Sequence, residues 1–148
     1  MSLAWVSGHD AVVADWAAKM FHGKLNFWAV HSAFGVAGND GTLIGAALFS
    51  DYYPGGNVEL TFVGPKTLTR AILNQISYHA FVTLQASRVT AKTRRSTPGV
   101  SKLLTKAGFR FECIQKRYFG PDDGDDAVVY SFPAEQGAKW IRKVKVDG

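Results

Sequence analysis

The sequence predicts an α/β fold: a three-layer α+β sandwich with a mixed, mostly antiparallel sheet flanked by helices. Three strand-like segments joined by short turn signals indicate an antiparallel meander in the first half of the chain. In the second half, strands alternate with helices, an order that implies a mixed sheet covered by helices. Residues 57–84 join the two halves, because a strand breaks there at Gly64-Pro65 and a helix follows at once.

The first half is predicted to begin with a short strand at residues 3–6. Ser7 and Asp10 match a capping box that would open a helix ending at Gly23. The apolar face expected for this helix consists of Val12, Val13, Trp16, Ala17 and Met20. Strands are predicted at 26–37 and 43–53, joined by the hairpin signal Asn39-Asp40-Gly41 and followed by the turn Pro54-Gly55-Gly56.

The strand at 57–63 carries two distinct faces. One consists of Val58, Leu60 and Phe62, the other of Glu59, Thr61 and Val63. The next helix presents Leu68, Ile72, Ile76 and Ala80 at helical spacing.

A strand at 88–93 then precedes a second helix with Thr97 as N-cap, Pro98 as first residue and Gly108 beyond its end. Leu103 and Leu104 are expected to be buried in it. Two strands at 109–119 and 127–132 would enclose an acidic turn. We expect one domain over residues 1–133 and a basic tail over 134–148, docked through Trp140 and Ile141.

Composition excludes several classes of protein. The 148 residues are 47% hydrophobic and 20% charged, which is typical of one soluble domain. No membrane-spanning run or signal pattern is visible, and the lone Cys113 excludes an intrachain disulfide, so a cytoplasmic location is expected. The four histidines lack metal-ligand spacing, so no metal is predicted.

The net charge of +5 favours an anionic partner. A helix start after Gly64-Pro65 would aim free N–H groups at one spot, with Lys66 and Arg70 beside it, which suits phosphate. An ordinary strand-to-helix connection is the alternative. A second cluster, Arg88, Lys92, Arg94 and Arg95, would serve phosphate contact, nucleic-acid binding or solvation. No RNA-binding or helix-turn-helix signature is present, which argues against nucleic acid.

Two motifs carry a resemblance to a known family. Val63-Gly64-Pro65 resembles the Val-x-Pro that ends the fourth strand of the GNAT superfamily of acyl-CoA-dependent N-acetyltransferases, and residues 66–71 (KTLTRA) fall on its pyrophosphate loop. Residues 97–109, ending Lys106-Ala107-Gly108-Phe109, resemble the family's fourth helix. The element order is similar over nearly the whole chain. Residues 108–132 are closest to members that acetylate ribosomal-protein N-termini.

The resemblance implies acetyl-CoA as co-substrate, no metal, and an amine acceptor, either a small molecule or a protein N-terminus or lysine. It places the Val63 N–H at the thioester carbonyl oxygen and favours Glu59 as general base, because the family often uses a strand carboxylate. Tyr118 and Tyr130 are each candidates for the acid that protonates the thiolate. The alternatives are a solvated strand residue for Glu59 and buried sheet residues for the two tyrosines. The residues implied for the co-substrate are Phe62, Val63, Lys66, Leu68, Thr69, Arg70, Ala71, Arg95 and Thr97.

Three positions depart from the family pattern. Thr69 replaces a loop glycine, Leu104 stands where many members have a tyrosine, and Thr97 stands near a common asparagine. These departures keep open an alternative function, that of a catalytically inactive binding or structural module of the same fold. A homodimer is also left open.

Overall fold

The computed structural model describes residues 3–20 and 30–147, and within them one seven-stranded sheet in the order β1-β2-β3-β4-β5-β7-β6. The strands are β1 Ala4–Val6, β2 Val30–Ala37, β3 Leu43–Ser50, β4 Asn57–Val63, β5 Arg88–Arg94, β6 Arg110–Gln115 and β7 Ala127–Pro133. Neighbouring strands in this sheet are antiparallel except β4 and β5, which are parallel. The predicted mixed, mostly antiparallel sheet is confirmed.

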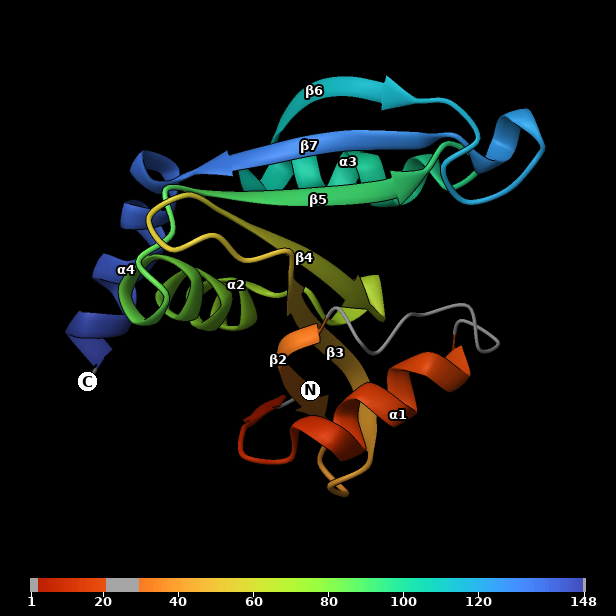
Figure 1. Cartoon of the computed structure of the whole chain (residues 1–148). Helices are drawn as coiled ribbons and strands as arrows, with labels where there is room; N and C mark the ends of the chain where they lie inside the picture. Colours follow the sequence, from red (N-terminus) through yellow and green to blue (C-terminus); the bar gives the residue numbers. More distant parts are fainter. Residues whose placement is uncertain (1–2, 21–29, 148) are drawn as a thin grey trace.

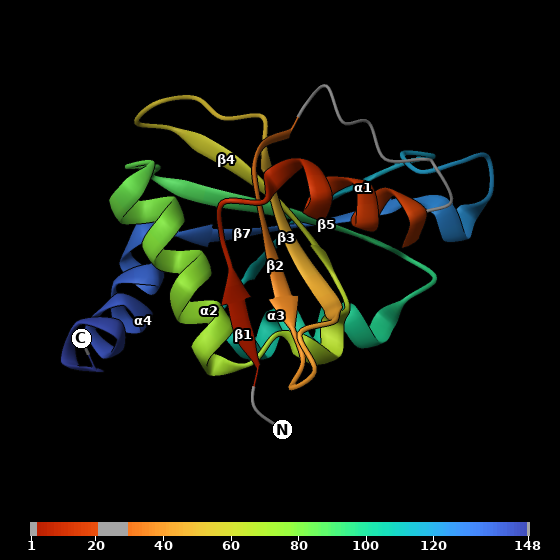
Figure 2. The same cartoon turned by 90° about the horizontal axis from the view of Figure 1, so that it is seen from below.

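Helices cover both faces of this sheet. They are α1 Asp10–Met20, α2 Arg70–Ser77 with its π-helical continuation η3 Tyr78–Thr83, α3 Pro98–Ala107, α4 Ala134–Asp147 and the short 3₁₀ turns η2 Pro65–Thr67 and η4 Asp123–Asp125. Helix α1 packs on one face, and α2, α3 and α4 pack on the other. Figure 2 shows α2 and α4 side by side at one end of the sheet. The predicted three layers are therefore present.

Two apolar clusters fill the two interfaces. The larger joins Val58 and Leu60 of β4 to Ile72 and Ile76 of α2. The smaller cluster lies under α1, and Val63 packs against it. The alternation predicted for β4 and the helical spacing predicted for α2 are both confirmed.

Helix α1 differs from its prediction at its start and on its buried face. It begins at Asp10 rather than after Ser7, and the Asp10 carboxylate accepts a hydrogen bond from the Ala33 N–H at 3.0 Å. Its buried residues are Val13, Ala14, Ala17 and Ala18, whereas Val12 and Met20 are exposed. The small alanine side chains let the helix approach the sheet closely. The size of the apolar side chains was therefore a poor guide to which face of α1 is buried. Gly23 and residues 26–29 lie outside the described residues.

The second half of the chain departs from prediction at three places. Strand β6 ends at Gln115 instead of 119, because the chain turns at Arg117 (φ 56°), whose N–H binds the buried Asp126 carboxylate at 2.8 Å. In α3, Leu104 is buried but Leu103 is only half-buried. Thr97 precedes α3 as expected, yet its hydroxyl donates to the Arg94 carbonyl instead of capping the helix.

The C-terminal segment forms α4, which packs against α2 and η3. The Trp140 side chain packs against the larger apolar cluster, as was expected of an aromatic residue in this basic segment. Among the described helices, none combines the length and apolar character needed to cross a membrane.

Candidate functional site

A gap opens in the sheet between its two parallel strands. The β4–β5 pairing runs from Asn57 opposite Arg88 to Leu60 opposite Ala91 and then stops. Beyond that point β4 stays paired with β3 and β5 stays paired with β7. Figure 1 shows the two strands starting together and separating along their length. The predicted divergence is confirmed, but it begins after Leu60 and not after Val63, because each half of the sheet twists with its own neighbours.

The two sides of this gap carry unpaired backbone groups. Residues 61–63 of β4 and 92–94 of β5 have no partner strand across the gap. Unpaired strand edges bind extended ligands through main-chain hydrogen bonds. The gap can therefore accept an extended molecule that carries amide or carbonyl groups.

The N-terminus of α2 follows β4 after the 3₁₀ turn η2, so the helix begins at Arg70 and not immediately after Gly64-Pro65 as predicted. Gly64 turns the chain with φ of 77°, and any side chain there would meet the Ile44 carbonyl. Thr69 is the N-cap, and its hydroxyl accepts a hydrogen bond from the Ile72 N–H at 3.3 Å. The Leu73 N–H bonds the Thr69 carbonyl, which leaves the N–H groups of Arg70 and Ala71 without intrahelical partners.

Charge at this helix start favours an anion. The side chains at this helix start are exposed at Lys66, Thr69, Arg70 and Ala71. Among the described residues, no acidic group lies within 4.0 Å of the Lys66 ammonium or the Arg70 guanidinium. Leu68 instead packs against the larger apolar cluster, as Phe62 does. Free N–H groups, the helix dipole and two unpaired cations together make a site suited to phosphate.

Glu59 and Tyr118, proposed separately from the sequence, are joined by Lys92. The Lys92 Nζ lies 3.2 Å from Glu59 Oε1 and 3.4 Å from the Tyr118 hydroxyl, and 4.4 Å from the centre of the Tyr118 ring. Burial alone would lower the pKa of Lys92, but the Glu59 carboxylate and Tyr118 outweigh it, and the pKa is raised. The trio lies at the mouth of the gap, because Lys92 is the first β5 residue past the last strand pair.

The turn that carries Tyr118 is held by Asp126. This carboxylate is 1% exposed, and it binds the Arg117 N–H, Arg95 at 3.3 Å and Lys116 at 3.6 Å. The hydrogen bond from the Arg117 N–H lowers the pKa of Asp126 more than any other contact does. Burial acts in the opposite direction, but the pKa remains lowered. The acidic turn therefore serves to place Tyr118 beside Lys92.

The predicted basic cluster is largely neutralised by ion pairs. Arg88 pairs with Glu112, Arg94 with Asp125 and Arg95 with Asp126. Arg95 and Thr97 lie beyond the end of β5, and the Arg95 charge is already matched. Free positive charge is consequently greater at the start of α2 than along β5.

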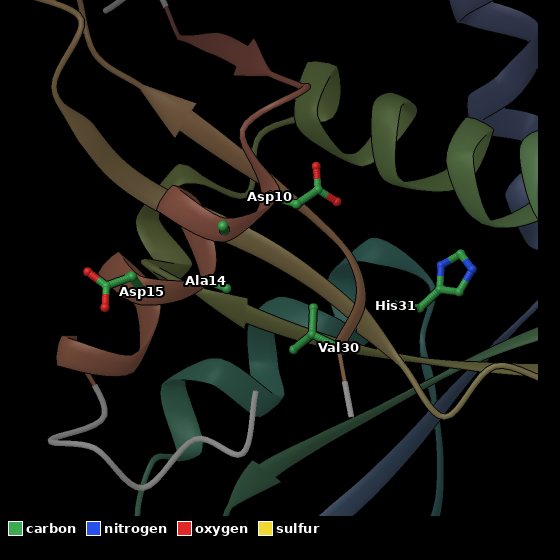
Figure 3. A pocket seen from close by; sticks show the side chains of 6 residues that line it. Asp10, Ala14, Asp15, Val30 and His31 are labelled. Carbon is green, nitrogen blue, oxygen red and sulfur yellow. The ribbon is translucent and has the colours of Figure 1, made fainter. Parts of the chain in front are cut away.

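A cleft of about 390 Å³ lies between α1 and the start of β2 (Figure 3). It is lined by Asp10, Ala11, Ala14, Asp15, Val30 and His31. Val30 is paired with Ser50, which is paired with Glu59, so the cleft and Glu59 lie on one row of the α1 face. Neighbouring strands lie about 4.7–4.9 Å apart, so the backbones of Val30 and Glu59, two strands apart, are separated by roughly 10 Å.

The sequence placed Lys92 only in the basic cluster, without a link to Glu59 or Tyr118, and it did not predict Asp10 or His31 as site residues. Lys92 and Thr90 lie on the same face of β5, and the partner of Thr90 on β4 is Glu59. This strand register exists only in the folded sheet, so the sequence could not show that Lys92 lies near Glu59. No set of three or more His, Cys, Asp or Glu side chains in the described ranges is arranged to hold a metal ion.

Solved structures share this fold. A chimera of the spermidine N-acetyltransferase SpeG from Vibrio cholerae and hSSAT matches with a TM-score of 0.69 at 14% identity, covering 93% of this chain and 99% of that chain. An acetyltransferase of the GNAT family from Bacillus anthracis matches with a TM-score of 0.55 at 19% identity, over 70% of this chain and 66% of that chain. No family model and no curated protein sequence matches the chain. The chain therefore has a GNAT-like α/β fold.

Proposed function

We propose that the protein is an N-acetyltransferase that moves an acetyl group from acetyl-CoA to an amine. The observation that carries this proposal is the gap between β4 and β5, followed directly by the cationic start of α2. The gap suits the extended amide-containing arm of CoA, and the helix start suits its pyrophosphate. The acetyltransferases that share the fold support the same activity.

The co-substrate would be held along β4 and α2. The Val63 N–H is our candidate donor to the thioester carbonyl oxygen, with Phe62 and Leu68 as apolar contacts. The N–H groups of Arg70 and Ala71, with the Lys66 and Arg70 side chains, would bind the pyrophosphate. Thr69 limits how closely that group approaches. Arg95 and Thr97 remain candidates for the 3′-phosphate, with a smaller expected contribution from Arg95 because Asp126 already pairs with it.

Catalysis would use the trio at the mouth of the gap. Acetyl-CoA supplies an acyl group activated as a thioester. Glu59 takes a proton from the acceptor amine, the β4 amide stabilises charge on the carbonyl oxygen, and Tyr118 gives a proton to the departing thiolate. Tyr130 is a poorer candidate for the acid, because its side chain is buried within the larger apolar cluster.

The acceptor would enter through the cleft beside α1. Asp10 lines it, together with Asp15, which pairs with Lys19, and Glu59 lies along the same row, so a cationic amine suits it better than an anionic one. The spermidine acetyltransferases of similar fold favour a polyamine. The resemblance of residues 108–132 to ribosomal-protein acetyltransferases favours a protein N-terminus. Thiol release from acetyl-CoA, measured with spermidine and with N-terminal peptides in parallel, separates these two acceptor classes.

Thermal unfolding with and without acetyl-CoA tests the proposal. At a hundred times its Kd, a ligand stabilises the fold by about 2.7 kcal/mol. We expect acetyl-CoA to raise Tm, Arg70→Ala to reduce the shift strongly, and Arg95→Ala to reduce it less. Absence of a shift at millimolar acetyl-CoA and low salt would refute the proposal. A shift without turnover of any amine would instead support the inactive binding module.

A further inference from the structure

We propose that Lys92 is itself an acetyl acceptor, so that the protein modifies the Nζ of its own Lys92 from acetyl-CoA. This proposal rests on the acetyltransferase function proposed above. It concerns an amine that the fold already holds in place, and it therefore requires no external acceptor.

The position of Lys92 meets the geometric needs of an acceptor. Its Nζ is within hydrogen-bond reach of both the candidate base and the candidate acid, at 3.2 Å from Glu59 and 3.4 Å from the Tyr118 hydroxyl. It follows Ala91, the last β5 residue paired with β4, so its side chain starts where the strands part. The buried Asp126 fixes the turn that carries Tyr118.

The surroundings of Lys92 differ from those of the other lysines seen in ion pairs. The side chains of Lys19 and Lys116 are 76% and 73% exposed in their pairs, as expected for solvated charges. Lys92 and Glu59 are each only 18% exposed. An ordinary surface ion pair therefore does not describe this contact, and its place at the gap gives the amine access to a thioester bound there.

The reaction balances with the groups present and acetyl-CoA alone. Against the effect of burial, the Glu59 and Tyr118 contacts raise the pKa of Lys92, so loss of the first proton is the costly step of the reaction. Glu59 takes that proton from the Lys92 ammonium, and the neutral nitrogen attacks the thioester carbonyl carbon. The C–N bond forms, the C–S bond breaks, and the nitrogen loses its second proton to solvent, as Glu59 then does with the first. The thiolate takes a proton from Tyr118, which is restored from solvent. The products are Nε-acetyl-Lys92, CoA thiol and one released proton.

Acetylation would change the site that carries it. The amide is neutral, so Glu59 would lose its ion pair and the Tyr118 ring its cation contact, while the added acetyl group would stay at the mouth of the gap. The chemistry is therefore limited to one acetyl group per chain at this position.

Peptide mass spectrometry after incubation with acetyl-CoA tests the proposal. The exposed Lys102 and Lys106 of α3 serve as internal controls for non-specific acetylation. We expect occupancy at Lys92 to exceed that at Lys106 although Lys92 is less exposed, and excess free CoA to suppress modification at Lys92 alone. Glu59→Gln should slow modification of Lys92 by roughly 10²-fold or more.

Lys92→Arg is the matched variant, because it keeps the positive charge beside Glu59 but cannot be acetylated under these conditions. Its intact mass should show no specific acetyl adduct while acetyl-CoA still raises its Tm. Lys92 occupancy equal to or below that of Lys106, or the same Lys92-to-Lys106 ratio with acetyl phosphate as donor, would overturn the proposal.

The thermal shift separates this proposal from the one on which it rests. A wild-type protein that acetyl-CoA stabilises but does not modify at Lys92 would refute self-acetylation alone. A protein that acetyl-CoA neither stabilises nor modifies would refute both.

Discussion

His79 lies on η3 between two aromatic rings and a buried serine. Its Nε2 is 2.9 Å from Ser32 Oγ, and its ring centre is 4.5 Å from that of Phe34 and 4.7 Å from that of Phe49. The pKa of His79 is lowered to about 4, chiefly by burial and also by the nearby His31, while Asp10 acts in the opposite direction. His79 is therefore neutral in the folded protein at neutral pH.

This neutral histidine makes stability depend on pH. Between pH 6.5 and about 4, the unfolded chain protonates His79 while the folded chain does not. The contribution of His79 to stability is thus constant above the unfolded pKa and falls as the pH drops through this window. His79→Gln should show a smaller loss of urea-unfolding free energy between pH 7 and pH 4.5 than wild type. The exposed His9→Gln is the control, and an unchanged slope in His79→Gln would contradict this assignment.

Thr69 is the N-cap of α2 and occupies the position where the GNAT pattern has a glycine. Its hydroxyl caps α2, a role that glycine can replace at a cost of only a few tenths of a kcal/mol, whereas alanine costs about 0.5–2 kcal/mol. Thr69→Gly should therefore leave stability nearly unchanged and tighten acetyl-CoA binding by closer backbone approach. Thr69→Ala should lower stability without that gain. Calorimetric titration of both variants checks this, and equal affinities would contradict it.

At the level of the element, two helical glycines have opposite surroundings. Gly137 of α4 lies against the Phe81 ring, which a Cβ there would overlap, while a Cβ on Gly99 of α3 would meet no atom within 4 Å. Intrinsic propensity favours alanine over glycine in a helix interior by about 1 kcal/mol. The space around each glycine decides whether alanine is the more stable residue there.

We therefore expect Gly137→Ala and Gly99→Ala to change stability in opposite directions. Gly137→Ala should destabilise, because the overlap with Phe81 forces α4 away from η3, and overpacking typically costs about 1–3 kcal/mol. Gly99→Ala should be neutral or stabilising by up to about 1 kcal/mol. Urea unfolding measures both. Stabilisation by Gly137→Ala would show that α4 does not pack as described.

At the level of the whole molecule, the sheet consists of two parts joined by one short parallel pairing. Strands β1 to β4 form one part, β5, β7 and β6 the other, and only four residue pairs join them. The larger apolar cluster spans this junction and contains residues of both parts, so the gap forms without loss of the core.

A ligand in the gap should protect backbone amides on both of its sides. We expect acetyl-CoA to slow hydrogen exchange at residues 61–63 and 92–94, and at the start of α2. The β3–β4 turn at 51–56 is the internal control, because it lies at the end of β4 where β4 and β5 are paired. Protection confined to α2 would place the phosphates there but would refute binding between the strands.

Local pattern in the sequence sufficed for most of the fold. Val58 and Leu60 alternate with Glu59, Ile72 and Ile76 repeat at helical spacing, and Gly41 and Gly108 adopt the positive φ that their turns require. Each of these signals depends on neighbours along the chain, which is why they could be interpreted without the structure. The exposed cations Lys66 and Arg70 at the start of α2 were predictable for the same reason.

Only the tertiary structure decided which residues meet at the site. Lys92 meets Glu59 because the parallel register places Thr90 opposite Glu59 and then ends, and Tyr118 joins them because Asp126 turns the chain at Arg117. The same long-range contacts turned the predicted basic cluster into ion pairs and selected the alanine face of α1 for burial. Strand register, ion pairing and helix rotation depend on distant parts of the chain, so periodicity and local charge could not determine them.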